Sequence, residues 1–255
     1  MLTHNELKAF LDEKATQYNN PEFIDTDPVQ IVHRYRQKED MEIAGFLTAT
    51  IAWGNRKSII NNANRMMELL GNSPFDFVMS HRETDLERLS PFVHRTYNGD
   101  DFKHFIKGLR HIYNEYGGIE SVFSEYRNAP RLQEAIADFR GRFFEIPHLQ
   151  RTEKHVSNPL KGSSAKRINM FLRWMVRQDN KGVDLGLWKQ VSPAQLSCPL
   201  DVHSGKAARK LGLLKRKQND AKALIELDDS LRKLDAQDPV RYDFALFGLG
   251  VFEKF

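Results

Sequence analysis

The segment from Met41 to Trp53 places the strongest constraint on the fold, because apolar side chains surround the whole helix that it would form. A helix that is apolar on nearly every side must be buried on most of its faces. We therefore expect this segment to be the central element of a helical domain. Helical periodicity also dominates the rest of the chain, and alternating strand patterns are almost absent. The sequence predicts an all-α protein.

Residues that begin and end helices separate the predicted elements. Thr3 and Asp27 are expected N-caps, because short polar side chains accept hydrogen bonds from the first unpaired N–H groups of a helix. Asp100 or Asp101 is expected to open a later helix. We expect helices at 4–18, 28–36, 40–53, 57–70, 101–116, 119–125, 131–145, 164–178, 203–212, 219–234 and 239–247. Residues 241–250 are typical of a terminal packing helix with a glycine stop. The least regular segments are 80–98, 144–162 and 181–199.

Composition excludes several classes of protein. With 40% apolar residues and no apolar run long enough to span a membrane, the chain is typical of a globular protein without a membrane partner. Cys198 is the only cysteine, which excludes an internal disulfide and favours a reducing, cytoplasmic location. The N-terminal residues lack the pattern of a secretion signal.

Motifs for cofactors are absent from the sequence. It contains no Gly-x-x-x-x-Gly-Lys loop, no Gly-x-Gly-x-x-Gly after a strand and no Cys-x-x-Cys pair. His104 and His111 are seven residues apart, which is not a metal-binding signature. We therefore expect neither a metal nor an organic cofactor.

Positive charge is concentrated in one quarter of the chain. Between Leu160 and Lys217, 13 Lys and Arg accompany three Asp, an excess of ten charges in a protein whose net charge is +4. The remainder of the chain is therefore at −6. Because such segregation attracts polyanions, it favours a nucleic-acid partner.

Two motifs within the basic stretch resemble a catalytic site. Gly162-Ser163-Ser164 supplies a turn and hydroxyl groups at the start of a helix, whose N–H groups and dipole favour a phosphate. Lys166 follows in the first turn, where the dipole and the charge of Arg167 lower the pKa of an amine, as a nucleophile requires. The second motif, Pro199-Leu200-Asp201-Val202-His203, adds a carboxylate.

These motifs resemble the helix-hairpin-helix DNA glycosylase superfamily, which includes endonuclease III and the 8-oxoguanine glycosylases, and most nearly its archaeal 8-oxoguanine type. The resemblance is best over residues 160–213 and weaker over 40–72. In this family a hairpin leads into a helix whose early lysine is the nucleophile, and a later aspartate completes the site. As a whole, the chain also resembles a bacterial family of conserved hypothetical proteins.

The motifs also depart from the family pattern. The hairpin of the family usually reads Gly-h-Gly, where h is apolar, and this chain has Gly162-Ser163-Ser164. The gap between Lys166 and Asp201 is 35 residues, longer than in the bacterial enzymes. The cysteines that hold an iron–sulfur cluster in endonuclease III are missing.

The resemblance implies base-excision repair of damaged double-stranded DNA by a monomeric glycosylase with abasic-site lyase activity. Lys166 falls on the nucleophile and Asp201 on the catalytic carboxylate, with Lys161 as the next candidate nucleophile. The DNA-binding residues that it implies, or that the basic stretch suggests, are Lys161, Gly162, Ser163, Ser164, Arg167, His203, Lys206, Arg209 and Lys210, with Lys215–Lys217 beyond them.

A pocket for the extruded base is expected at the end of the buried helix. There Trp53 would stack on the base and Asn55 would hydrogen-bond its edge, as the resemblance implies. The polar and aromatic segment from Phe92 to Asn98 is a further candidate for approaching DNA.

The resemblance also implies two lobes, residues 40–178 and residues 1–39 with 179–255, which place Lys166 and Asp201 on opposite sides of a cleft. Other interpretations stay open. Lys166 can be a solvated or phosphate-binding lysine, Asp201 an N-cap and Trp53 a core residue. The protein would then be a non-catalytic DNA-binding protein, or a helical interaction protein that binds acidic partners or RNA.

Overall fold

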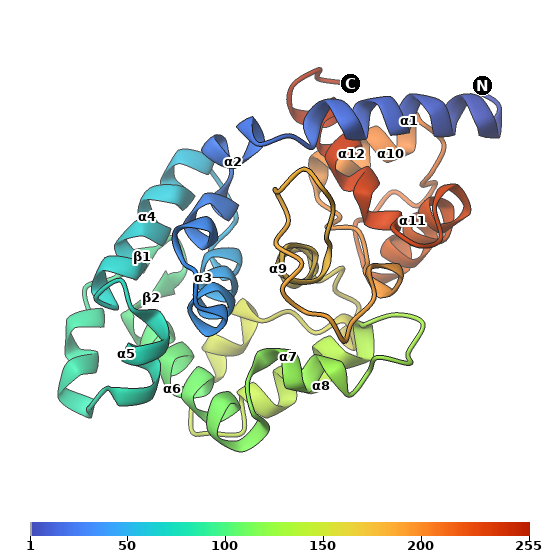
Figure 1. Cartoon of the computed structure of the whole chain (residues 1–255). Helices are drawn as coiled ribbons and strands as arrows, with labels where there is room; N and C mark the ends of the chain where they lie inside the picture. The colour runs from blue at the N-terminus through green and yellow to red at the C-terminus, as the bar shows by residue number, and fades with distance from the viewer. Residues whose placement is uncertain (1) are drawn as a thin grey trace. The chain divides into compact units, whose positions relative to one another are not determined.

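The computed structural model describes residues 2–255 and is predominantly helical (Figure 1), which confirms the all-α prediction. Its helices are α1 (His4–Tyr18), α2 (Glu22–Thr26), α3 (Lys38–Thr50), α4 (Arg56–Leu69), α5 (Pro74–Ser80), α6 (Gly99–Tyr116), α7 (Ile119–Ser124), α8 (Gln133–Phe143), α9 (Lys166–Val176), α10 (Val202–Lys210), α11 (Ala221–Leu234) and α12 (Tyr242–Val251). Short 3-10 helices cover Pro28–Arg34, Glu83–Leu89, Gln150–His155, Pro159–Lys161, Pro193–Gln195 and Pro239–Arg241. A small antiparallel hairpin, β1 (Val93–His94) and β2 (Tyr97–Asn98), pairs Val93 with Asn98.

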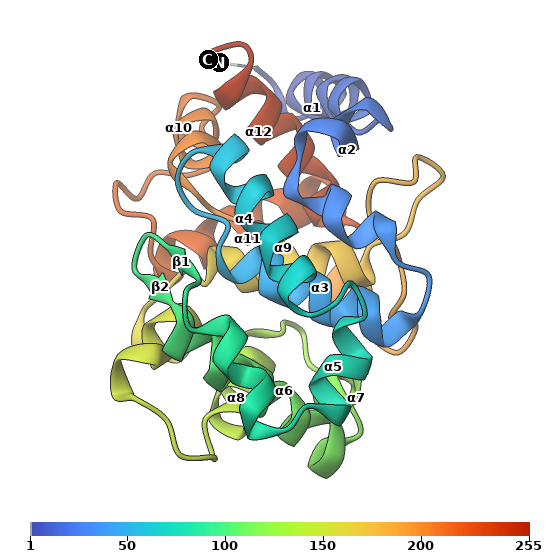
Figure 2. The ribbon, with the colours of Figure 1, turned by 90° about the vertical axis from the view of Figure 1, so that its left-hand side faces the viewer.

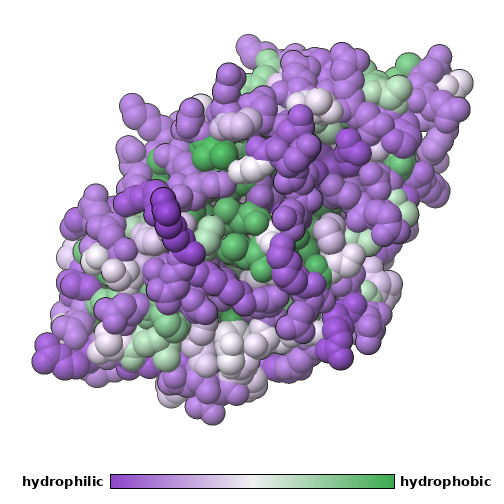
Figure 3. Space-filling view, viewed as in Figure 1, coloured by the Kyte–Doolittle hydropathy of each residue, from purple (hydrophilic) through white to green (hydrophobic). Residues whose placement is uncertain are grey.

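Backbone contacts divide the chain into two compact units. Unit 1 contains Met1–Phe23 (described from Leu2), Arg127–Glu134 and Asn158–Phe255. Unit 2 contains Ile24–Tyr126 and Ala135–Ser157. Polar and charged residues cover most of the face shown in Figure 3.

Unit 2 is built around α3, which is buried from Met41 through Thr50. This confirms that the segment is a buried helix, although it ends at Thr50 and leaves Trp53 in the following turn. Phe46 stacks on Phe105 of α6 with ring centroids 5.6 Å apart. Aromatic packing of this kind adds to the free energy gained by burying the rings.

Unit 1 encloses a second core between α1, α10, α11 and α12. Helix α12 contacts α1 and α10, and the three lie together in both ribbon views (Figure 1 and Figure 2). Glycines permit these close contacts, because a Cβ at Gly248 would lie 2.0 Å from the ring of Tyr18, and one at Gly250 would lie 2.7 Å from the carbonyl oxygen of His203. The expected glycine stop is wrong, since α12 continues to Val251.

Helix α9 is also buried in unit 1, from Ile168 through Val176. The segment that follows folds back over it (Figure 1), and the N–H groups of Leu185 and Trp188 donate to carbonyl groups at the end of α9. Arg173 on α9 donates to Asp184, with Nε 3.1 Å from Oδ1, and to Asp243 of α12.

This ion-pair network explains why the division differs from the expected lobes. The prediction grouped residues 40–178 and so placed α9 apart from the C-terminal helices. In the structure, Arg173 and the segment that covers α9 attach it to α12, and α9 belongs to unit 1.

Several local predictions are confirmed and others corrected. Thr3 caps α1 in a capping box with Glu6, and Asp27 accepts a hydrogen bond from the N–H of Val29. The predicted helix at 28–36 is a 3-10 helix. The cap of α6 is Asn98, three residues before Asp101, rather than Asp100 or Asp101. Within residues 2–255, no helix is both long and apolar enough to span a membrane.

Candidate functional site

Lys166 is the first residue of α9, which begins two residues later than the predicted helix at 164–178 but keeps Lys166 in its first turn, and a strained turn precedes it. Ala165 adopts a left-handed conformation with φ 46°, and Gly162 has φ 91°. The left-handed region is costly for a residue with a Cβ, so the structure around Ala165 must hold it there. Oγ of Ser163 accepts a hydrogen bond from the N–H of Ala165 at 3.1 Å.

The start of α11 anchors this turn. Ser163 forms a β-bridge with Asp220, and the N–H of Ala221 donates to the carbonyl of Gly162 at 3.0 Å. Ser164 is buried, and its carbonyl accepts a hydrogen bond from the side chain of Asn169. The backbone before Lys166 is therefore fixed by contacts within unit 1.

The side chain of Lys166 is half-buried against its own helix, with Nζ 3.5 Å from Sδ of Met170. Arg167 is also half-buried, and loss of contact with water lowers the pKa of its guanidinium to about 10. Lys161, the alternative nucleophile, is exposed. The amine of Lys166 thus lies in a less polar environment than that of Lys161.

Asp201 is the N-cap of α10. Its Oδ1 accepts hydrogen bonds from the N–H groups of His203 and Ser204, at 2.8 and 2.9 Å. Its own N–H donates to Oγ of Ser204 at 2.9 Å, completing a capping box. Capping is thus one role of this residue, and it uses one oxygen. Oδ2 accepts no hydrogen bond from residues 2–255.

The sequence analysis missed a buried carboxylate, Asp243, whose pKa responds to the charges of both Lys166 and Asp201. Asp243 on α12 is 5% exposed, and burial raises its pKa to about 6. The charge of Asp201 also raises that pKa, whereas the charges of Arg173 and Lys166 lower it. Lys166 and Asp201 therefore both lie within electrostatic range of one group. An aspartate inside the apolar sequence of α12 was the available signal, because a buried charge needs a partner.

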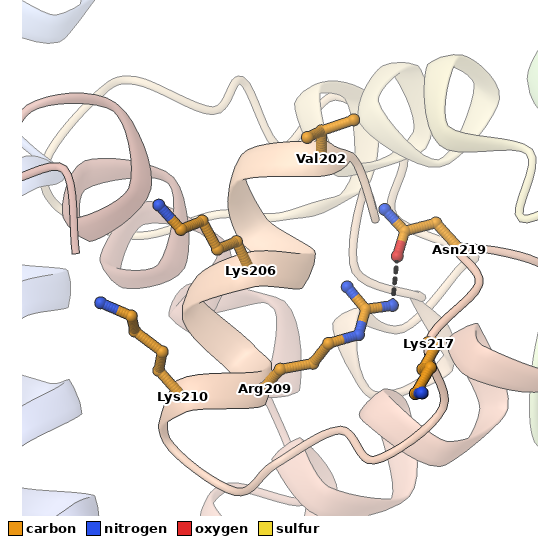
Figure 4. Close-up of a pocket in the computed structure, with 6 residues that line it drawn as sticks. All are labelled: Val202, Lys206, Arg209, Lys210, Lys217 and Asn219. Carbon is orange, nitrogen blue, oxygen red and sulfur yellow. Dashed lines mark hydrogen bonds between the residues drawn. The ribbon is translucent and has the colours of Figure 1, made fainter.

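The predicted cations of α10 gather around a hollow of about 540 Å³ (Figure 4). Its lining residues are Val202, Lys206, Arg209, Lys210, Lys217 and Asn219. The hollow contains four cations and no carboxylate, so it favours anions. Sequence analysis named the three cations of α10 but did not name Asn219.

Trp53 and Asn55 belong to unit 2. The ring of Trp53 is half-buried and meets that of His94 edge to face, with centroids 5.1 Å apart. Asn55 is exposed and caps α4, accepting a hydrogen bond from the N–H of Ser58 at 3.1 Å. The hairpin that carries His94 comes from the predicted irregular segment 80–98, so the candidate base-binding residue Trp53 meets the segment that was a further candidate for approaching DNA.

The structure therefore collects most of the predicted site in unit 1. Lys166 and Asp201 lie in the same unit, which corrects the expectation that they come from two different lobes. His203 is exposed beside Asp201 and contributes its N–H to the cap. Among residues 2–255, no group of acidic, histidine and cysteine side chains is arranged to hold a metal ion.

Comparison with known proteins identifies one family. No curated protein matches the chain, and no solved structure matches it. A family model described as "Protein of unknown function (DUF2400)" matches residues 27–252, which include Lys166, Asp201, Asp243 and the whole lining of the hollow. The chain belongs to this family.

Proposed function

We propose that the protein is a DNA glycosylase that removes a damaged base from double-stranded DNA and cleaves the resulting abasic site. The observation that carries the proposal is the placement of Lys166 and Asp201. They stand at the starts of two helices of one unit, Lys166 as the first residue of α9 and Asp201 as the N-cap of α10. The charge of each shifts the pKa of the buried carboxylate of Asp243. An amine and a carboxylate are the groups that this reaction needs.

In the proposed reaction, the target nucleotide first leaves the base stack. The neutral amine of Lys166 attacks C1′ of the deoxyribose, and the bond from C1′ to the base breaks, with its electron pair leaving on the base. The departing base takes up a proton, and the amine loses one. Opening of the sugar ring gives an imine between Lys166 and C1′. Elimination of the 3′ phosphate then cuts the strand, and water releases the lysine.

Asp201 stabilises the positive charge that develops on the sugar as the base leaves. Its capping role does not prevent this, because the cap occupies Oδ1 and leaves Oδ2 without a hydrogen bond from the described residues. The cap also fixes the side chain with respect to α10. A carboxylate held in place needs less rearrangement when charge appears.

The cations of α10 supply affinity for the DNA backbone, which does not depend on base sequence. The buried thiol of Cys198 is compatible with the reducing cytoplasm in which such an enzyme would act, as a monomer on duplex DNA.

Borohydride trapping tests this proposal, because reduction converts the imine into a stable protein–DNA adduct. The substrates are duplexes that carry 8-oxoguanine, uracil, an alkylated purine or an abasic site. We expect an adduct with at least one of them, and Lys166→Gln should abolish it. Lys233→Gln, which removes an exposed lysine of α11, is the matched control and should retain it.

Asp201→Asn separates catalysis from capping. Asparagine caps helices as well as aspartate does, so the variant should fold normally while losing the charge. Trapping should slow by roughly a hundredfold or more if the carboxylate stabilises the transition state. Absence of any adduct on every substrate, or an adduct that survives Lys166→Gln, would refute the proposed reaction.

A non-catalytic DNA-binding protein is the second candidate, and the cap at Asp201 favours it because capping alone accounts for the aspartate there. This candidate predicts that Lys166→Gln and Asp201→Asn bind duplex DNA as the unaltered protein does. It also predicts that no adduct forms.

A further inference from the structure

We propose that the hollow along α10 is a preformed subsite for the phosphodiester backbone of DNA. The inference rests on the proposed function in taking DNA as the source of the phosphates. It concerns a separate set of residues from Lys166 and the carboxylate of Asp201, so the two proposals can fail independently.

Charge is the first argument. Lys206, Arg209, Lys210 and Lys217 line the hollow, and none of them forms an ion pair with a carboxylate of residues 2–255. Of the neighbouring acids, Asp220 pairs with Arg216 instead. No described carboxylate neutralises these four charges, so the hollow keeps a net positive charge, and phosphate is the anion that groups of lysine and arginine bind most often in nucleic-acid sites.

The fixed position of Arg209 is the second argument. Its Nε donates to the carbonyl of Arg216 at 2.8 Å, and its Nη2 donates to Oδ1 of Asn219 at 2.6 Å. Asn219 in turn donates from Nδ2 to the carbonyl of Asp201 at 2.6 Å. Arg209 is therefore held in one orientation before any ligand arrives, and this lowers the entropy lost on binding.

Gly205 makes this arrangement possible. A Cβ at this position of α10 would lie 2.8 Å from Oδ1 of Asn219 and 2.9 Å from Nη1 of Arg209. Both distances are too short for a carbon contact, so a side chain here would displace the pair. The absence of a Cβ at Gly205 thus matches the geometry of the hollow.

The size and position of the hollow favour a segment of a DNA strand over a single ion. A volume of about 540 Å³ accommodates an organic group of nucleotide size. Figure 4 shows Lys206 and Lys210 on one side of α10, with Arg209, Asn219 and Lys217 on the other. Helix α10 begins directly after Asp201, so phosphates bound here would neighbour the nucleotide presented to that carboxylate.

The test measures binding of a short labelled duplex and of tripolyphosphate at several salt concentrations. Gly205→Ala changes no charge and should weaken duplex binding by severalfold, because it displaces Arg209 and Asn219. Lys206→Gln should weaken it by roughly tenfold and reduce the salt dependence by about one counterion. Lys233→Gln removes an exposed lysine of α11 outside the hollow and is the matched control, with little expected change.

The possible results separate the two proposals. If Gly205→Ala and Lys206→Gln both bind duplex like the control, with folding verified by circular dichroism, the subsite proposal is wrong. If they lose tripolyphosphate binding but keep duplex binding, the ligand is a free phosphate compound and the DNA assignment is overturned. Trapping with unaltered protein tests the glycosylase separately, and Lys166→Gln should still bind duplex in the hollow.

Discussion

The thiol of Cys198 lies 3.6 Å from Oδ1 of Asp243 inside unit 1, and Arg173 donates to the other oxygen of the same carboxylate. Cys198 stands three residues before Asp201, and Arg173 stands seven residues after Lys166 on α9. One buried side chain therefore connects the two segments that carry the proposed catalytic groups. Replacement of Asp243 should disturb both segments.

Cys198 should be inert in the native protein. It is 0% exposed, and burial together with the charge of Asp243 raises the pKa of its thiol, so little reactive thiolate can form. At pH 8, a disulfide reagent should label the unfolded chain quickly and the native chain only as fast as it unfolds. Rapid labelling of the native protein would show that the thiol is accessible.

Asp243 should make stability depend on pH. Its pKa is about 6 in the folded protein and about 4 in an unfolded chain. Between these values the native state holds a proton that the unfolded state has released, so stability falls as pH rises from about 4 to 6. Relative to Asp243→Asn, the unaltered protein should lose roughly 2–3 kcal/mol over this range. Urea unfolding of both proteins at each pH measures the difference in their free energies of unfolding. Contributions of other titrating groups cancel in this difference. A difference that is constant with pH would contradict the assignment.

Removal of Arg173 should be strongly destabilising. The side chain is 4% exposed and pairs with Asp184 and Asp243, which are also buried. Arg173→Met leaves two carboxylates without this partner and should cost about 3–5 kcal/mol. Lys8→Met, which removes the half-buried partner of Asp12 in the same unit, should cost about 1 kcal/mol or less. Similar unfolding midpoints for the two variants would show that the buried network adds little.

Quenching of the fluorescence of Trp53 should detect an extruded base. Trp174 and Trp188 are 0% and 1% exposed, whereas Trp53 is half-buried, so a neutral quencher such as acrylamide should act mainly on Trp53. Trp53→Phe should therefore remove most of the quenchable fluorescence. If Trp53 stacks on an extruded base, a duplex with a lesion should protect it more than an undamaged duplex. Equal quenching with and without lesion DNA would argue against a base pocket at this position.

Local features of the fold could be predicted because local physics determines them. The cap at Thr3 and the burial of the segment from Met41 need only neighbouring residues and the pattern of apolar side chains. Asn55 shows the limit of this approach. An asparagine before a helix caps it and can equally contact a base, and the sequence alone does not distinguish these roles.

Long-range features could not be predicted. Asp243 accepts a hydrogen bond from Arg173, which lies 70 residues earlier in the sequence, and no periodicity relates the two positions. Asn219 reaches the hollow only because the turn after α10 returns it to the carbonyl of Asp201, 18 residues earlier. The assignment of α9 to unit 1 likewise depends on contacts that form only in three dimensions.

The packing of α1 on α12 has a consequence for biosynthesis. The hydroxyl of Tyr242 donates to Asp12 across 230 residues, so α1 leaves the ribosome long before the helix on which it packs. In the sequence, all of unit 2 falls between α1 and α12, so unit 2 can complete its own core before α12 is made. During translation, the apolar face of α1 therefore has no partner helix until α12 emerges, and until then it is exposed to chaperones.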